Sequence, residues 1–149
     1  MHPDLTDRES LDEVVGQVLG LRRSDAQPHP LNRLARERWL RHRLSREPSQ
    51  GGFTALRNVE GYYPRTGLHD AAPAFAIGVD PSTATTLVAF SVGIDPSLVP
   101  HAAAVGAREG VERIELVLPE RDQHRITIEL AERLRIPCAI TTADEPWPT

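Results

Sequence analysis

Six arginines lie close together between Pro30 and Arg46, with a single acid, Glu37, among them. This segment has a net charge of +5, and because the whole chain carries −4, the remainder carries −9. Guanidinium groups bind carboxylates and phosphates through paired hydrogen bonds. We therefore expect a non-catalytic binding or interaction domain that engages a polyanionic or acidic partner. The candidate binding residues are Arg33, Arg36, Arg38, Arg41 and Arg43.

The partner of the segment from Arg33 to Arg46 stays open between nucleic acid, another protein and the chain's own acidic remainder. The arginines are distributed around the expected helix and do not form one stripe, so some of them must face the body of the protein. The tail at residues 144–147, which holds Asp144 and Glu145, is a candidate acidic partner within the chain or across a homo-oligomer. All 17 basic residues are arginines, and the absence of lysine excludes lysine-dependent chemistry. GC-rich codon usage also explains this bias toward arginine.

A second group of polar residues follows the ends of the expected parallel strands. Ligands of such sheets bind beyond the carboxyl ends of the strands. A small-molecule or anion-binding protein, or an enzyme, that uses this edge is therefore the alternative. The competing interpretation is that Asp95, Ser97 and Asp122 cap helices. The candidate edge residues are Asp95, Glu120, Arg121, Asp122 and His124.

The nine residues A-F-A-I-G-V-D-P-S from Ala74 return as A-F-S-V-G-I-D-P-S from Ala89, 15 residues later. Either a ligand-binding loop is duplicated, or two strands share the same ending; we favour the shared ending because Asp accepts from following amides and Pro stops a ladder. The short connection requires an antiparallel hairpin. Asp80 and Asp95 are then expected at opposite ends of it.

Several chemistries find no support in the residue pattern. The six histidines include no H-E-x-x-H, and Cys138 is the only cysteine, so we expect no metal site. Cys138 is interpreted as a buried, inert thiol. No G-x-S-x-G, G-x-G-x-x-G or phosphate-binding loop is present. We therefore expect no cofactor and no catalytic residue, and we favour a protein that is not an enzyme.

Hydrophobic periodicity predicts a single α/β domain over residues 1–149. An N-terminal helical segment spans about 6–46, with helices at 7–22 and within 30–46; a sheet domain spans about 53–142, and a Pro-rich tail spans 143–149. The hairpin at about 72–94 leads into parallel β-α-β-α-β, with helices at 99–109 and 122–135 and strands at 112–118 and 138–142. The sheet is therefore mixed.

The order helix, strand, strand, strand, helix, strand resembles the core of the restriction-endonuclease-like fold, over residues 31–142 at most. In that family an acid ends the second strand, and Asp80 matches this position. The third strand, residues 87–93, has neither the acid nor the lysine that the family places there. The resemblance implies a degenerate domain that lacks metal-dependent cleavage and acts as a structural partner.

The sequence also favours a cytoplasmic protein. The single cysteine allows no intrachain disulfide, which fits a reducing compartment. The first twelve residues hold no apolar run that would indicate a signal peptide. The longest strongly apolar stretch, residues 87–94, is too short to cross a bilayer, so we expect no membrane partner.

Overall fold

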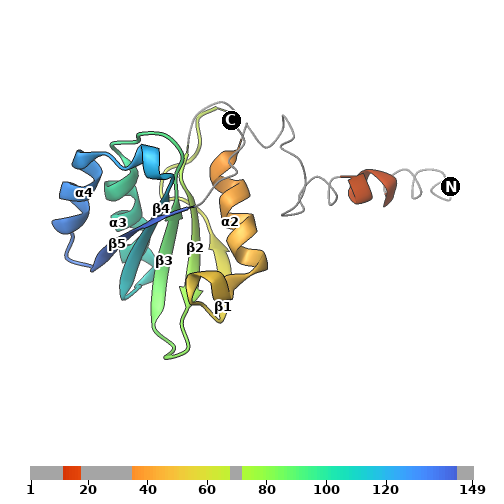
Figure 1. The fold of residues 1–149 in the computed structure, drawn as a ribbon, viewed down its shortest axis with the longest axis horizontal. Helices are drawn as coiled ribbons and strands as arrows, with labels where there is room; N and C mark the ends of the chain where they lie inside the picture. Colours follow the sequence, from red (N-terminus) through yellow and green to blue (C-terminus); the bar gives the residue numbers. More distant parts are fainter. Residues whose placement is uncertain (1–11, 18–34, 68–71, 144–149) are drawn as a thin grey trace.

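The structure is a computed structural model, and it describes residues 12–17, 35–67 and 72–143 (Figure 1). Residues 12–17 are helical, and the rest of the helix predicted at 7–22 lies outside the described residues, as do Arg33 and residues 144–149. The elements of the main body are α2 (Arg36–Arg46), η2 (Pro48–Gly51), β1 (Ala55–Val59), β2 (Ala74–Val79), β3 (Thr85–Phe90), α3 (Leu98–Glu109), β4 (Arg113–Leu118), η3 (Glu120–Asp122), α4 (Arg125–Glu132) and β5 (Cys138–Thr142).

The five strands form one mixed sheet in the order β1-β2-β3-β4-β5. Strands β1, β2 and β3 pair antiparallel, and β3, β4 and β5 pair parallel. The predicted α/β fold, with its hairpin leading into parallel β-α-β-α-β, is thus confirmed. This topology places the carboxyl ends of β1, β3, β4 and β5 at the same edge of the sheet, next to the start of β2.

Helices cover both faces of the sheet, α2 on one face and α3 with α4 on the other (Figure 1). The central strands β2 and β3 have side chains buried on both faces of the sheet. Their sequences are therefore nearly continuous runs of apolar residues. Alternate residues of β3 enter different cores: Leu87 packs with α3, and Val88 packs with Leu40 of α2. None of the helices in the described ranges is long and apolar enough to span a membrane.

The inner stripe of α2 combines apolar and charged residues. Glu37, Leu40, Arg41 and Leu44 follow helical spacing and therefore share one face. Leu40 is buried and Leu44 is half-buried against the core beneath α2. Because these leucines hold the helix on the sheet, Glu37 and Arg41 are also turned toward the body of the protein.

The duplicated A-F-x-[IV]-G-[VI]-D-P-S motif ends in two turns with the same hydrogen bonds. The carboxylates of Asp80 and Asp95 each accept from the backbone amide two residues later, at 2.8 Å, and from the Ser hydroxyl of the same residue, at 2.6 Å. In the β2–β3 register Val79 pairs with Thr85 and Ala74 with Phe90, so the two carboxylates lie at opposite ends of the hairpin. They form no two-carboxylate site.

The helix predicted at 122–135 is shorter and begins later than expected. Residues Glu120–Asp122 form the separate 3-10 turn η3, and α4 begins at Arg125 with His124 as its N-cap. The expectation that Asp122 caps this helix is therefore wrong. Its carboxylate instead accepts from the backbone amide of Gly93, at 2.7 Å, and ties the β4–α4 connection to the β3–α3 connection.

Candidate functional site

A cavity of about 430 Å³ lies between α2, the segment that follows β1, the start of β2 and the start of α3. Charged and hydrogen-bonding side chains dominate its wall, which includes three arginines, two acids, a histidine and two tyrosines. The volume falls in the range of about 300–1,000 Å³ that small-molecule sites occupy. The lining residues are Glu37, Arg38, Arg41, Val59, Glu60, Gly61, Tyr62, Tyr63, Pro64, Arg65, Ala72, Pro73, Ala74, Phe75 and His101.

Arg41 enters this cavity from the inner face of α2. Its side chain is half-buried, and Nη1 donates to the backbone carbonyl of Phe75 at 3.1 Å. Burial lowers the pKa of the Arg41 guanidinium below its ordinary value; the neighbouring Arg38 lowers it further, and Glu60 acts in the opposite direction. Within the described residues, no carboxylate lies at ion-pair distance from Arg41.

Glu37 lies one turn earlier on the same face of α2, and its residue is only 7% exposed. Burial raises the pKa of the Glu37 carboxyl above its ordinary value, and Asp95 also raises it. The Glu37 backbone amide, Arg65 and Arg36 lower this pKa but do not outweigh the burial. The cavity wall thus holds a buried acid one helical turn from a half-buried base.

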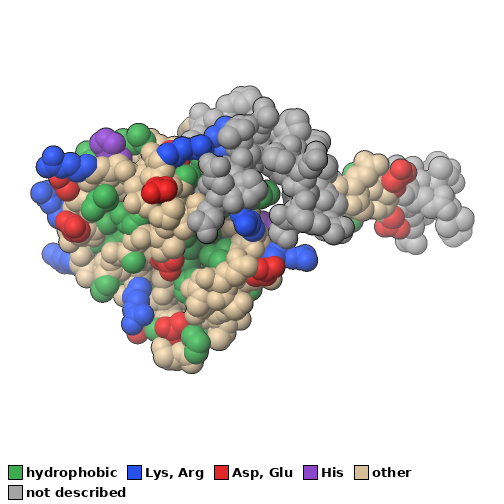
Figure 2. All heavy atoms as spheres, viewed as in Figure 1, with side chains coloured by type: hydrophobic (Ala, Val, Ile, Leu, Met, Phe, Trp, Pro, Cys, Tyr) green, Lys and Arg blue, Asp and Glu red, His purple; other side chains and the backbone are tan. Residues whose placement is uncertain are grey.

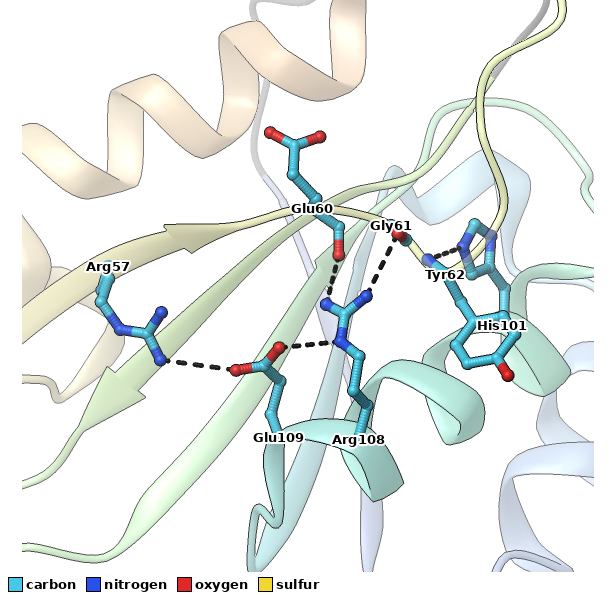
Figure 3. A network of polar contacts seen from close by, with 7 residues as sticks. All are labelled: Arg57, Glu60, Gly61, Tyr62, His101, Arg108 and Glu109. Atoms are coloured by element: carbon cyan, nitrogen blue, oxygen red, sulfur yellow. Dashed lines mark hydrogen bonds and ion pairs between the residues drawn. The ribbon is translucent and has the colours of Figure 1, made fainter.

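His101 of α3 fixes the segment that forms the opposite wall (Figure 3). Its Nε2 accepts from the backbone amides of Tyr62 at 2.9 Å and Tyr63 at 3.3 Å, so this nitrogen carries no proton. The ring lies 4.8 Å from that of Phe75 and 5.0 Å from that of Tyr63. A side chain at Gly61 would place its Cβ 3.1 Å from Nε2, so glycine permits this close approach.

The environment of His101 favours the neutral imidazole. Its residue is only 6% exposed. Burial lowers the pKa of the imidazole below its ordinary value, and Arg108 lowers it further, whereas Asp95 raises it. The neutral form is the one that accepts the two amide hydrogens, so burial and hydrogen bonding favour the same state.

Arg108, two turns further along α3, holds the same segment (Figure 3). Its Nη2 donates to the carbonyl of Glu60 at 2.6 Å and its Nη1 to that of Gly61 at 3.3 Å. Glu109 orients this guanidinium by accepting from Nε at 2.9 Å, and it also pairs with Arg57 at 3.5 Å. The start and the end of α3 therefore position the cavity wall that follows β1.

The structure separates the arginines predicted to bind a partner. Arg38 and Arg41 line the cavity, but Arg36 and Arg43 do not. Arg43 lies over the Trp39 ring, 5.5 Å from its centroid, and Arg36 is half-buried beside Glu37. Arg33 lies outside the described residues. On the face drawn in Figure 2, basic and acidic side chains of the described residues are interspersed.

The predicted sheet-edge residues do lie at the carboxyl edge of the sheet, but the side chains of Asp95, Asp122 and His124 accept hydrogen bonds from backbone amides of the same chain. Asp95 begins a turn by accepting from the Ser97 amide, and Asp122 accepts from the Gly93 amide. Nδ1 of His124 accepts from the amide of Ile126 at 3.3 Å. Glu120 and Arg121 are exposed. No three His, Cys, Asp or Glu residues in the described ranges are grouped to hold a metal ion. Of these five residues only Asp95 influences the cavity, through its charge near Glu37 and His101.

Sequence reasoning selected Arg38 and Arg41 but missed the opposite wall. The available signal was a polar residue on an apolar helix face, since His101 shares its face with Leu98, Ala102 and Val105. That Gly61, Tyr62 and Tyr63 meet this histidine depends on tertiary packing.

Comparisons with protein-family models, with curated proteins and with solved structures found no match to this chain.

Proposed function

We propose that this protein is a binding domain that takes a small anionic molecule into the cavity between α2 and the segment after β1. Arg41 supplies the primary cation and Arg38 assists it. The observation that carries the proposal is the half-buried Arg41 guanidinium, which lines the cavity and is held by the Phe75 carbonyl, with no carboxylate at ion-pair distance among the described residues. This retains the expectation of an acidic partner and narrows it to one cavity.

Desolvation supplies the physical reason. Removing a guanidinium from water without a counter-charge is unfavourable, and the lowered pKa of Arg41 reflects that cost. An anion in the cavity would restore the missing charge interaction and use the donors that Phe75 leaves free. The hydrogen bond to the Phe75 carbonyl already restrains the guanidinium at the cavity wall, so less side-chain entropy is lost when an anion binds.

A compact anion fits these arginines better than a polyanion does. Polyanion binding draws its affinity from several exposed cations that contact successive phosphates. Here Arg41 faces inward and Arg43 lies over Trp39, whereas Arg38 and Arg46 are exposed. Nucleic acid binding is the competing outcome, and a strong loss of affinity with added salt would identify it.

Calorimetric titration of the full chain with acetate, succinate and inorganic phosphate tests the proposal. We expect saturable binding of at least one of these anions, and we expect Arg41→Gln to weaken it about tenfold or more, as for loss of a charged hydrogen bond. Arg41→Lys keeps the charge and should retain part of the affinity. Arg46→Gln is the matched control, because Arg46 is exposed in the last turn of α2.

The result that would overturn the proposal is the absence of saturable binding by all three anions. Equal weakening by Arg41→Gln and Arg46→Gln would also overturn it, because the cavity would then have no special role. Thermal unfolding of each variant serves as the control for folding. A variant that unfolds at the wild-type temperature and has lost affinity reports on the cavity.

A further inference from the structure

We infer that the ligand is a zwitterion, a small amino carboxylate whose carboxylate contacts Arg41 and whose ammonium contacts Glu37. This inference rests on the proposed function and names the ligand class of the same cavity. It depends on a juxtaposition within α2: a buried acid and a half-buried base, one helical turn apart, that line one cavity and do not pair with each other.

The spacing of Glu37 and Arg41 is the one at which helical residues normally form an ion pair. With the acid four residues before the base, the Cβ atoms lie about 5–6 Å apart and the orientation is the favourable one. No Glu37–Arg41 ion pair is present, however, and Arg41 donates to the Phe75 carbonyl. Among the described residues, neither group is therefore neutralised by an ion pair, and each keeps hydrogen-bonding positions for a third molecule.

The buried carboxylate of Glu37 indicates a ligand that carries a positive charge. More than nine-tenths of the residue is buried, yet no side chain among the described residues donates a hydrogen bond to its carboxylate. Its own backbone amide donates to the carboxylate, and the charges of Arg36 and Arg65 favour the ionised form, whereas the charge of Asp95 opposes it. Burial outweighs the favourable contributions. A carboxylate whose burial outweighs the compensation from its described neighbours is costly, and an ammonium or amide donor in the cavity would offset that cost.

The geometry also limits the length of the ligand. One helical turn separates the two charged groups, so a chain of a few methylenes between ammonium and carboxylate fits better than a long one. The exposed rings of Tyr62 and Tyr63 border the same cavity, and aromatic faces attract ammonium groups. A series of glycine, β-alanine and γ-aminobutyrate therefore spans the relevant separations.

Calorimetry with matched probes tests the inference on the full chain. We expect the best amino acid of the series to bind at least about tenfold more tightly than its N-acetyl derivative, which keeps the carboxylate and loses the ammonium. In Glu37→Gln this difference should fall to less than about threefold, and binding of the N-acetyl compound should not weaken, because the variant removes a negative charge from the cavity. Glu132→Gln, which removes an exposed acid on α4, should leave the difference intact.

The failures of the two proposals are distinguishable. If the N-acetyl derivatives bind as tightly as the amino acids and Arg41→Gln weakens both, the zwitterion is excluded and the anion site stands. If the difference persists in Glu37→Gln, Glu37 is not the ammonium site and the inference is wrong. If none of the amino acids, N-acetyl derivatives and simple anions binds, both proposals fall together.

Discussion

Burial disfavours the charged form of two side chains beside the cavity, the carboxyl of Glu37 and the imidazole of His101. The consequences for stability have opposite signs with respect to pH. A carboxyl whose pKa is raised by folding lowers stability as pH rises, whereas an imidazole whose pKa is lowered by folding reduces stability as pH falls. Two variants separate these effects.

The first residue-scale prediction is that Glu37→Gln stabilises the unliganded protein. The amide has nearly the same shape and removes a buried charge that the described neighbours compensate poorly. At pH 7 we expect the free energy of unfolding to rise by about 1 kcal/mol, and the gain should shrink as pH falls toward 4.5, where the unfolded carboxyl is half protonated. Urea unfolding between pH 4.5 and 7.5 measures both. A destabilised Glu37→Gln at pH 7 would show that the carboxylate makes a favourable contact.

The second residue-scale prediction concerns His101. Protonation places a hydrogen on Nε2, which then repels the amides of Tyr62 and Tyr63. We expect His101→Gln to cost about 1–3 kcal/mol at pH 7.5, since two part-buried backbone amides lose their acceptor. Because the folded pKa lies below 6.5, the wild-type protein should lose this advantage as pH falls from 6.5 downward. A difference between the two proteins that is constant from pH 7.5 to 5.5 would contradict the assignment.

At the scale of elements, α3 determines the shape of the wall opposite α2. Its first turns carry His101 and its last turn carries Arg108, and together they bind backbone groups of residues 60–63 (Figure 3). The wall formed by α2 depends on Leu40 and Leu44, which seat the helix on the sheet. The cavity therefore lies at the edge of the sheet, and residues of two helices that pack on opposite faces of that sheet contribute to its lining.

The connection between α2 and the sheet gives the element-scale prediction. Gly78 of β2 lies under Phe53, and a Cβ at this position would lie 2.5 Å from the Phe53 ring. Gly78→Ala should therefore destabilise the fold by about 1–3 kcal/mol, as overpacking does. In a Phe53→Ala background the same substitution should cost less than about 0.5 kcal/mol, because the ring is gone. Equal costs in the two backgrounds, measured by urea unfolding, would show that this contact does not determine the packing.

At the scale of the whole molecule, the fold was more predictable than the site. The motif repeated at residues 74–82 and 89–97 and the short connection between its copies required a hairpin, and the later βαβ rhythm required parallel strands. Both are local consequences of side-chain periodicity and chain length. The boundary at residues 120–125 was not predictable, because Asp122 has the chemistry of an N-cap and bonds instead to Gly93, 29 residues away.

The candidate site was only half predictable, for the same reason. The inner face of α2 follows from helical spacing once Leu40 and Leu44 are known to be buried, and it contains Arg41. His101 contacts Tyr62 and Tyr63, which lie 39 and 38 residues before it in the sequence. No periodic pattern in the sequence indicates such a long-range contact. Charge composition indicated an acidic partner, but composition does not show which arginines face inward.

Amide chemical-shift mapping of the full chain, titrated with the anion that binds best in calorimetry, tests the central claim most directly. A ligand at Arg41 should shift the amides of cavity-lining residues along one saturable curve: those of residues 37, 38 and 41, of residues 60–63 and 65, and of residues 74–75. The same titration of Arg41→Gln should produce no saturable shifts there. Shifts that cluster instead at residues 120–124, or that persist unchanged in Arg41→Gln, would contradict the account and move the site to the sheet edge.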